Sequence, residues 1–345
     1  MITKHLVMNA AASEMHSIGS MSVALVVTSP PYPMIEMWDE CFCQQDGEIK
    51  TYLQKGLSTV AFERMHHILD QVWHEVDRVL IPGGIVCVNI GDATRTMNGI
   101  FQMFSNHNRI ISAFGKMKYC VLPDIIWRKP SNSPNKFLGS GMYPAGAYVT
   151  YEHEYILIFR KGGKRLFTSN KDMRQKSAYF WEERNVWFSD LWEIKGIKQK
   201  LTDSKGRGRS AAFPFEIPYR LINMYSIYGD TVLDPFVGTG TTLLAAMASG
   251  RNSIGIDIDP SFSELSIHAT QREPQLLNQY TEARLQEHQH FINSLSQEKQ
   301  QQCYQNKNHS FLVKTKQEVK AHIPMISAAR PIASGIECEY SWPNA

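Results

Sequence analysis

The sequence predicts an α/β domain with a mainly parallel β-sheet, and three features carry that prediction. Residues 21–29 and 85–92 are short apolar runs that do not alternate with polar residues, as in strands buried on both faces. Residues 60–80 carry apolar side chains at helical spacing. Residues 229–259 have the pattern of a strand, a glycine loop, a helix and a second strand. Strands that alternate with helices in this way form a parallel sheet covered by helices.

The remaining elements follow from local signals. Pro82 and the two glycines after it are expected to end the first long helix, because proline cannot continue a helix. Residues 121–127 and 153–160 have strand character, and the Pro/Gly/Ser-rich loop between them is too long for a simple connector. Residues 213–226 predict another helix. In the Gln- and His-rich C-terminal part, we expect the chain to be helical to about Gln300, and then irregular and peripheral.

Composition narrows the class of protein. The 345 residues are 43% hydrophobic, which suffices to bury a sizeable core in one large domain or two smaller ones. The six cysteines form no CxxC pair and suit a reducing cytosol better than a disulfide scaffold or a zinc site. Apolar runs fall far short of the roughly 20 residues that span a bilayer, and no signal peptide is recognisable. We therefore expect a soluble intracellular protein with no membrane partner.

The first functional motif directly follows the strand at 21–29 and reads Ser29-Pro30-Pro31-Tyr32. Its two prolines restrict the backbone and remove two backbone donors, and the tyrosine supplies an aromatic ring. A rigid loop at a strand end is the plain alternative. The combination favours a clamp for a flat group that carries a hydrogen-bond donor.

The second motif is a glycine loop, Asp234-Pro235-Phe236-Val237-Gly238-Thr239-Gly240-Thr241-Thr242. Its glycines allow a tight turn and the close approach of a ligand to the backbone. Asp257 ends the next strand, where an acidic side chain suits a ribose diol. The loop lacks the lysine of a phosphate loop and the third glycine of GxGxxG, which disfavours an ATPase and a pyrophosphate ligand. A cofactor with a ribose and a cationic end fits instead, and S-adenosylmethionine has both.

Together the motifs resemble those of the amino-methylating DNA methyltransferases. "DPFVGTGTT" resembles their S-adenosylmethionine-binding motif, "TSPPY" their catalytic motif, and "AAFPFEIPYRLI" the segment before the cofactor loop. The order of motifs, with the catalytic motif first, then a variable region and then the cofactor motif, resembles the β class. The resemblance covers roughly residues 5–270. It implies a Rossmann-like methyltransferase sheet with permuted motif order, in which the strands carrying the two motifs are neighbours, and a smaller target-recognition region.

The resemblance also implies a division of the chain. Its expected parts are a catalytic half at 1–160, a target-recognition region at 161–209, a cofactor-binding half at 210–270, and an accessory C-terminal helix and tail at 271–345.

The implied reaction is methyl transfer from S-adenosylmethionine to the exocyclic amine of a base that is flipped out of double-stranded DNA. The Ser29 side chain and the Pro30 carbonyl would accept the amine hydrogens, Pro31 would stiffen the loop, and Tyr32 would stack on the base. The implied cofactor-binding residues are Phe213, Asp234, Pro235, Phe236, Gly238, Thr239, Gly240, Thr241 and Asp257.

The identity of the base is the closer question. Serine at the first motif position resembles the cytosine-4-amino enzymes, whereas the adenine enzymes mostly carry Asp or Asn there. Both bases present the same amine donor, so the adenine-6-amino group stays an alternative target. Carbon-5 methylation needs a thiolate, usually in a Pro-Cys pair, and the sequence contains no such pair. The favoured reading is a site-specific modification enzyme of the bacterial cytoplasm, associated with the nucleoid through DNA and paired with a restriction endonuclease.

Alternatives from other classes also stay open. A DNA-binding module that has lost catalysis conflicts with the intact residues Ser29, Tyr32, Gly238 and Gly240. RNA and protein methyltransferases with a related clamp usually place the cofactor motif first, which is the reverse of the order found here.

A basic stretch is the expected DNA-contacting region. Residues 160–209 hold 14 Lys or Arg against 6 Asp or Glu, and cations neutralise phosphates. Aromatic side chains are interleaved, and we expect Trp187, Phe188 and Trp192 to form a small core rather than to meet DNA. The candidate DNA contacts are Lys205, Arg207 and Arg209, with Arg128 and Lys129 in the long loop.

Three further features have two readings each. Asp92 closes a strand beside the presumed site, where it contacts substrate or cofactor, or caps a helix. His66, His67 and His74 share one helix, but no Cys or carboxylate set accompanies them, so we expect solvated helix side chains rather than a metal site. The C-terminal tail is an accessory helix or a homodimer contact, with a disordered tail as the alternative.

Overall fold

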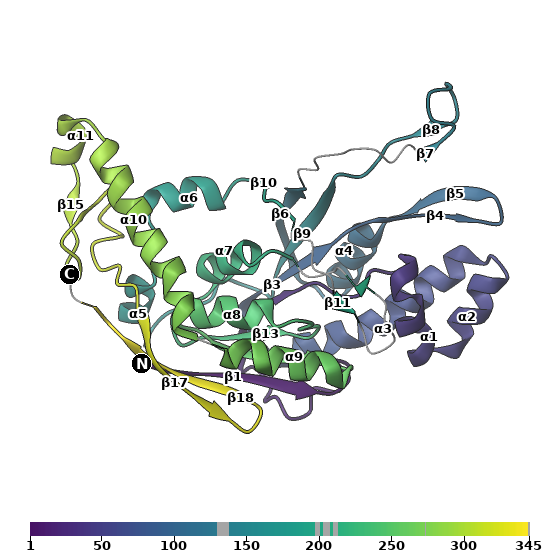
Figure 1. Ribbon diagram of the computed structural model, residues 1–345, viewed down its shortest axis with the longest axis horizontal. Helices are drawn as coiled ribbons and strands as arrows, with labels where there is room; N and C mark the ends of the chain where they lie inside the picture. Colours follow the sequence, from purple (N-terminus) through teal and green to yellow (C-terminus); the bar gives the residue numbers. More distant parts are fainter. Residues whose placement is uncertain (130–137, 197–200, 203–207, 210–212, 273, 344–345) are drawn as a thin grey trace.

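The computed structural model describes residues 1–129, 138–196, 201–202, 208–209, 213–272 and 274–343. A ten-stranded sheet runs through the described part of the chain (Figure 1). Its strands are β1 (Ile2–Asn9), β2 (Val23–Thr28), β3 (Leu80–Ile90), β6 (Cys120–Arg128), β9 (His153–Arg160), β10 (Leu191–Glu193), β13 (Thr231–Asp234), β14 (Asn252–Asp257), β17 (Met325–Ile332) and β18 (Gly335–Ser341). They lie in the order β10-β6-β9-β3-β2-β13-β14-β1-β18-β17.

The middle of this sheet is parallel, as predicted. Strands β3, β2, β13, β14 and β1 pair in parallel, whereas β9 and β18 join this group on its two sides in antiparallel fashion. All six residues of β2 are buried, which explains why its apolar run does not alternate. The sheet is therefore a mixed one with a parallel core, and the two motif-bearing strands, β2 and β13, are adjacent in it.

Helices cover both faces of the sheet. The helices that follow the first strands are α1 (Asp39–Gln45), α2 (Gly47–Gln54), α3 (Ser58–Val79) and α4 (Asn106–Lys116). The others are α5 (Lys171–Lys176), α6 (Trp181–Trp187), α7 (Glu216–Tyr225), α8 (Thr241–Ala248), α9 (Pro260–Gln271), α10 (Asn278–Ser294) and α11 (Gln297–Gln301), with short 3-10 turns at Glu36–Trp38 and Pro274–Leu277. Apolar residues of α3 and α4 pack on one face of β2 and β3, and those of α7 and α8 pack on the other.

Pro82 and the two glycines after it lie within a strand that begins directly after the long helix. Helix α3 ends at Val79, and β3 begins at the next residue and runs through Pro82 and both glycines. Val23 of β2 pairs with Leu80, but Leu25 pairs with Ile85, so β3 carries three extra residues between these pairs. This irregularity accommodates the glycines, and Gly83 has a positive φ of 77°. The predicted end of the long helix is thus confirmed, but the glycines form a bulge within β3 instead of a free turn, because both use the same residue types.

The end of the chain also differs from expectation. The prediction of an irregular tail after Gln300 is wrong for residues 325–341, since β18 pairs with β1 and β17 pairs with β18. In β18 the side chains of Ile336, Cys338 and Tyr340 are buried, an alternation that is visible in the sequence. Strand β1, which the sequence reading did not include, supplies the edge on which β18 pairs. The helical prediction up to about Gln300 is confirmed by α10 and α11.

The segment 161–209 forms α5, α6 and β10, of which β10 joins β6 at one edge of the sheet. Trp187 and Trp192 are buried, as predicted, but Phe188 is 37% exposed, so its assignment to the core was wrong. Helix α6 packs beside α10 through a buried ion pair in which the Arg284 guanidinium binds the Glu183 carboxylate. This segment is therefore attached to the C-terminal helix as well as to the sheet.

Two hairpins extend away from the body of the molecule (Figure 1). They are β4 (Ala93–Met97) with β5 (Ile100–Phe104), and β7 (Leu138–Gly139) with β8 (Ala147–Tyr148). The rings of Phe101 and Tyr148 stack with centroids 4.5 Å apart and join the two hairpins. Smaller two-stranded pairs are β11 (Leu201–Thr202) with β12 (Gly208–Arg209), and β15 (Tyr304–Gln305) with β16 (Leu312–Val313).

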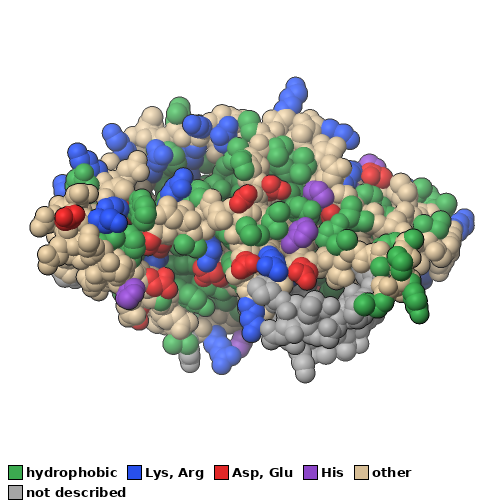
Figure 2. Space-filling model, turned by 90° about the horizontal axis from the view of Figure 1, so that it is seen from above, with side chains coloured by type: hydrophobic (Ala, Val, Ile, Leu, Met, Phe, Trp, Pro, Cys, Tyr) green, Lys and Arg blue, Asp and Glu red, His purple; other side chains and the backbone are tan. Residues whose placement is uncertain are grey.

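The surface carries charges of both signs. The face shown in Figure 2 has many Lys and Arg side chains along one long border, whereas Asp, Glu and His side chains gather near its middle. None of the helices in the described part of the chain is both long and apolar enough to cross a membrane.

Candidate active site

The two motif loops meet at one edge of the sheet. Because β2 and β13 are parallel neighbours, with Leu25 opposite Val232, the residues that follow them leave the sheet on the same side. Ser29 and Pro31 therefore line the same pocket as Gly238 and Thr239. The sequence predicted this juxtaposition of segments that lie far apart along the chain, and the structure has it.

Asp234 ties the two loops together. Its carboxylate, which is 2% exposed, accepts hydrogen bonds from the hydroxyls of Thr28 on β2 and Thr242 on α8, both at 2.6 Å. It also accepts the N–H of Phe236 at 3.1 Å. Burial raises the pKa of Asp234 to about 6, although these three donors act in the opposite direction. Both carboxylate oxygens are thus occupied by groups of the protein itself, although Asp234 also belongs to the pocket wall.

The glycine loop needs its glycines for two different reasons. Gly238 and Gly240 have positive φ angles of 50° and 83°, which other residues rarely adopt. Gly238 lines the pocket, and its N–H donates to the Asp257 carboxylate at 3.1 Å. Gly240 lies before the first turn of α8, where an added Cβ would be 3.3 Å from Ser266 on α9. Gly240, predicted to bind the cofactor, is therefore placed behind the pocket wall and against a helix.

Asp257 forms an acidic end of the pocket at the carboxyl end of β14. Its carboxylate accepts the N–H groups of Gly238 and Asp259, the latter at 2.9 Å. Burial raises the pKa of Asp257 to about 6. Asp234, Asp257 and Asp259 all contribute to the lining, whereas no Lys or Arg among the described residues does. A site of this charge suits a cationic ligand and disfavours a phosphate.

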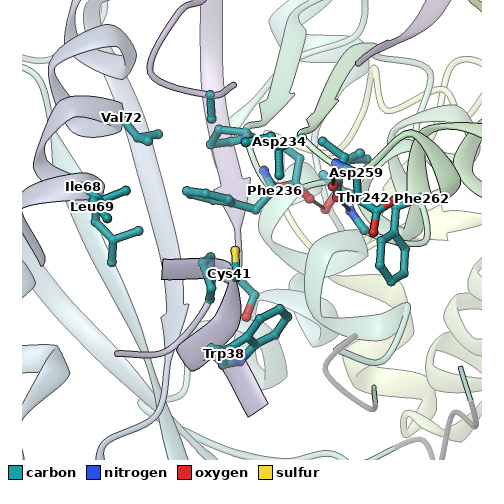
Figure 3. Close-up of a pocket in the computed structure, with 18 of the residues that line it drawn as sticks. Trp38, Cys41, Ile68, Leu69, Val72, Asp234, Phe236, Thr242, Asp259 and Phe262 are labelled. Atoms are coloured by element: carbon teal, nitrogen blue, oxygen red, sulfur yellow. Dashed lines mark hydrogen bonds between the residues drawn. The ribbon is translucent and has the colours of Figure 1, made fainter. Parts of the chain in front are cut away.

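The rest of the pocket is apolar. Figure 3 shows Ile68, Leu69 and Val72 of α3 along one side, with Phe236 of the glycine loop between them and the acidic end. The predicted residues Phe213, Pro235 and Thr241 also line it. Sequence reasoning missed the contributions of α1 and α9. The missed lining residues include Ala12, Ser13, Trp38, Cys41, Phe42, Gln45, Ile258, Asp259 and Phe262, in addition to those of α3.

These features match the chemistry of S-adenosylmethionine. Apolar and aromatic walls suit its adenine ring, Asp257 at a strand end suits its ribose, and the acidic lining suits its positive charges. The glycine at position 238 lets a ligand approach the backbone, since no Cβ stands in the way.

Beside this pocket lies a cluster of polar side chains around the SPPY loop. The Tyr32 hydroxyl donates to the Glu154 carboxylate on β9 at 2.9 Å, and lies 3.1 Å from the Ser29 hydroxyl. The Asn89 side-chain amide on β3 donates to Glu154 at 2.7 Å and to the Tyr32 oxygen at 2.8 Å. Burial, followed by the Glu154 charge, raises the pKa of Tyr32 well above its usual value. Pro30 is buried, and neither it nor Tyr32 is part of the lining of the pocket.

The ring of Tyr32 is half-buried and held from one side. A Cβ added to Gly91 would lie 3.1 Å from the ring, so the backbone of Gly91 packs against it. The role predicted for Tyr32, stacking on a base, stays a prediction.

The predicted DNA contacts fare differently. Arg128 pairs with Glu193 at 2.9 Å, and the Lys129 ammonium pairs with Glu154 of the cluster just described. Lys205 and Arg207 lie outside the described residues. Arg209 is placed in β12, but its side chain lies outside the description.

Packing accounts for Asp92 and for His66, so the expectation of a solvated side chain is wrong for His66, whereas His67 and His74 are exposed as expected. The Asp92 carboxylate accepts the N–H of His107 at 3.1 Å, in the first turn of α4, and binds the same residue's ring nitrogen. This is the helix-capping reading of Asp92. His66 is buried, with Nε2 3.0 Å from Asn106 Oδ1. The described residues contain no group of three or more His, Cys, Asp or Glu side chains that could hold a metal ion.

Known proteins share both the sequence and the fold. A family model described as DNA methylase matches residues 23–268. Type II methyltransferase M.MthZI of Methanothermobacter thermautotrophicus is 49% identical over 322 residues, covering 92% of this chain and 89% of the relative. Type II methyltransferase M.MjaI of Methanocaldococcus jannaschii is 53% identical over 274 residues, covering 76% of this chain and 90% of the relative.

Solved structures extend the likeness. TTHA0409 of Thermus thermophilus, solved in complex with S-adenosyl-L-methionine, superposes with a TM-score of 0.58 at 33% identity, covering 77% of this chain and 94% of that one. The cytosine-N4-specific PvuII DNA methyltransferase shares the fold, with a TM-score of 0.51 at 18% identity, over 82% of this chain and 94% of that one.

Proposed function

The chain belongs to the DNA methylase family, to the β-class amino-methylating enzymes that use S-adenosyl-L-methionine, and from this premise we propose that it methylates the exocyclic 4-amino group of cytosine at a specific site in double-stranded DNA. The observation that carries the proposal is the meeting of two loops at one edge of the sheet. The Ser29 hydroxyl stands at the same pocket as the glycine loop and Asp257, so an amine held by Ser29 faces the cofactor.

The chemistry asks little of the protein beyond positioning. When bound, S-adenosyl-L-methionine supplies a methyl group that is activated by a sulfonium. The thioether that remains would be the leaving group, and the proton lost by the amine nitrogen would pass to water. Ser29 Oγ and the Pro30 carbonyl accept the amine hydrogens, which draws electron density onto nitrogen and stabilises its developing positive charge. Tyr32 offers an aromatic surface to the extruded base.

Several residues are assigned to the cofactor. Asp257 takes the ribose, the acidic lining takes the positive charge, and Phe213, Phe236 and the Pro235 ring form apolar walls. Gly238, Thr239 and Thr241 present the loop backbone and hydroxyls. Asp234 acts chiefly by holding the loop, since its oxygens are already engaged. Gly240 acts through the shape of the backbone.

The choice of cytosine rests on the serine at the first position of the motif. Adenine offers the same kind of amine, so the choice needs a direct test. DNA from cells that express the protein is sequenced by a method that distinguishes 4-methylcytosine from 6-methyladenine, with a Ser29→Ala strain as the matched control. We expect 4-methylcytosine at one short sequence and none in the control. Methyladenine at a fixed site would overturn the base assignment, and unmodified DNA would overturn the proposal.

The wider role is that of a modification enzyme paired with a restriction endonuclease in the cytoplasm, where it binds the nucleoid through DNA. The Type II names of the two relatives support this pairing. Residues 161–209 serve as the target-recognition region between a catalytic half at 1–160 and a cofactor half at 210–270. The remaining residues, 271–345, support α6 through α10 and offer a surface for a second copy.

A further inference from the structure

Glu154 stands at the centre of the polar cluster beside the SPPY loop. It lies on β9 next to Tyr155, which pairs with Ile90 of β3, so its side chain reaches the carboxyl ends of the parallel strands. Its carboxylate is 14% exposed and each oxygen has its own partners. One oxygen accepts the Tyr32 hydroxyl at 2.9 Å and the Asn89 amide at 2.7 Å, and the other binds the Lys129 ammonium.

A carboxylate can only accept hydrogen bonds, and this sets the direction of the whole cluster. Since Glu154 takes the Tyr32 proton, the Tyr32 oxygen cannot donate to Ser29. The 3.1 Å contact between the two hydroxyls is therefore made by the Ser29 proton, which points to the Tyr32 oxygen. The proton of Ser29 is thus turned into the protein, and a lone pair of the same oxygen is left for the pocket that Ser29 lines.

Two neighbours keep this arrangement in place. The Lys129 ammonium compensates the charge of Glu154 and lies 4.4 Å from the centroid of the Trp127 ring. The Asn89 amide is oriented by donating to Glu154, since the reverse orientation would set two acceptors against each other. Lys129 is therefore better explained as the counter-ion of Glu154 than as a phosphate contact.

We propose that Glu154 is a positioning residue for methyl transfer, which makes the Ser29 hydroxyl an acceptor for the target amine by taking the Tyr32 proton. This inference rests on the proposed function, because it assumes that an amine binds at Ser29. Without the carboxylate, the Tyr32 proton is free to point at Ser29, and the Ser29 proton is then free to point into the pocket. A hydroxyl in that orientation opposes the N–H groups of the amine instead of accepting them.

The first experiment measures single-turnover methyl transfer at saturating DNA and S-adenosyl-L-methionine. Glu154→Gln should lower the rate roughly 10- to 100-fold, because the Lys129 ammonium attracts the amide oxygen and leaves the NH2 group, which is a donor, facing Tyr32. Glu152→Gln is the matched control on the same segment, since the Glu152 side chain is exposed and pairs with Arg128 rather than with Tyr32 or Ser29. Its rate should stay within about twofold of the wild type, the size expected for a site with no shared partner.

A double-mutant cycle separates positioning from a general structural effect. In a Ser29→Ala background, Glu154→Gln should cause no further loss, because the group it orients is gone. Tyr32→Phe keeps the ring but removes the proton, and should likewise abolish the effect of Glu154→Gln. Equal losses in the wild-type and Ser29→Ala backgrounds would overturn the proposal, as would a Glu154→Gln rate close to wild type.

The second experiment needs no activity. Tyrosine labelled with ¹³C at the ring carbon that bears the hydroxyl is titrated by NMR, and the Tyr32 signal is assigned by its loss in Tyr32→Phe. The pKa of Tyr32 should fall in Glu154→Gln and stay in Glu152→Gln, since the Glu154 charge disfavours the tyrosinate. An unchanged Tyr32 pKa would refute the contact. A protein with this titration but no methylation of DNA would refute the proposed function and leave the contact standing, so the two failures are distinguishable.

Discussion

Two of the carboxylates at the carboxyl edge of the sheet, Asp234 beside the cofactor pocket and Glu154 beside the SPPY loop, have different kinds of hydrogen-bonding partner. Asp234 is bound by two threonine hydroxyls and a backbone N–H, all of them neutral. Glu154 is bound by a tyrosine hydroxyl, an asparagine amide and a lysine ammonium. The buried carboxylate without a cation has its pKa raised to about 6.

The difference separates two tasks. The partners of Asp234 lie on β2, in the glycine loop and on α8. Its hydrogen bonds therefore join segments that are distant in the sequence, since Thr28 lies 206 residues before Asp234. Tyr32, a partner of Glu154, contacts the Ser29 hydroxyl, so the hydrogen bonds of Glu154 set the direction of the hydroxyl protons at the proposed substrate site. Substitutions around Asp234 should therefore affect folding and cofactor binding, whereas substitutions around Glu154 should affect the rate of methyl transfer.

The largest expected effect is on the rate, at Ser29. Ser29→Ala should lower the single-turnover rate by about 10²- to 10³-fold, the cost of removing one preorganised hydrogen-bonding group from a transition state. The dissociation constant of S-adenosyl-L-methionine, measured by calorimetry, should change by less than about threefold, since Ser29 only borders the cofactor pocket. A comparable loss of cofactor affinity would contradict the assignment of Ser29 to methyl transfer alone.

Asp234 should show the converse behaviour. Asp234→Ala leaves the hydroxyls of Thr28 and Thr242 without their acceptor and should reduce the free energy of unfolding by about 2–3 kcal/mol, as seen by chemical denaturation. Asp234→Asn keeps the volume and most of the hydrogen bonds, so its stability should stay within about 1 kcal/mol of the wild type. If the asparagine variant is as unstable as the alanine variant, charge rather than hydrogen bonding holds the loop.

How far the sequence predicts this site depends on the kind of contact. The strand, loop and helix around Gly238 follow from local patterns, and so does the adjacency of the two motifs once the family resemblance is known. The bond between Thr28 and Asp234 is invisible in the sequence, because it joins side chains that only the folded sheet brings together. The pairing of Lys129 with Glu154 is invisible for the same reason, since a lysine at a loop has the same local pattern whether its partner is a phosphate or a carboxylate.

Other parts were missed because their signal was short or ambiguous. The pocket residues Trp38, in the 3-10 turn, and Cys41, in α1, come from a stretch too short to show helical periodicity. The glycines near Pro82 indicate a turn and a bulge equally well, and only the pairing of β3 with β2 decides between them. The alternation in β18 was readable, but a strand at the end of a polar tail gains its stability from β1, which is more than 300 residues away.

The acidic end of the pocket predicts a pH dependence of moderate size. Asp257 has a folded-state pKa of about 6 against a usual value of 3.8, so the folded protein binds a proton between pH 6 and pH 4 that the unfolded chain does not. Its contribution to stability therefore rises as the pH falls through that window. The affinity for S-adenosyl-L-methionine should move the other way and fall by up to roughly tenfold per pH unit below 6, because protonation removes a carboxylate that faces a cationic ligand.

Calorimetry at several pH values checks this, with Asp257→Asn as the control. The variant should bind more weakly at neutral pH and show a flatter pH profile than the wild type. If the affinity of the variant depends on pH as steeply as that of the wild type, another group titrates. Asp234 is the first candidate, because its pKa is also raised to about 6.

The smallest expected effect is on DNA binding, at the exposed residue Arg128. Arg128 is 53% exposed and pairs with Glu193, which is also exposed, so losing this pair should cost little stability. If Arg128 contacts a phosphate, Arg128→Ala should weaken DNA binding for all sequences alike and reduce the salt dependence of binding by about one phosphate contact. Arg330→Ala on β17, at the opposite edge of the sheet, is the matched control and should leave DNA binding unchanged. An Arg128→Ala protein with an unaltered salt slope would show that Arg128 makes no phosphate contact and serves its ion pair with Glu193 instead.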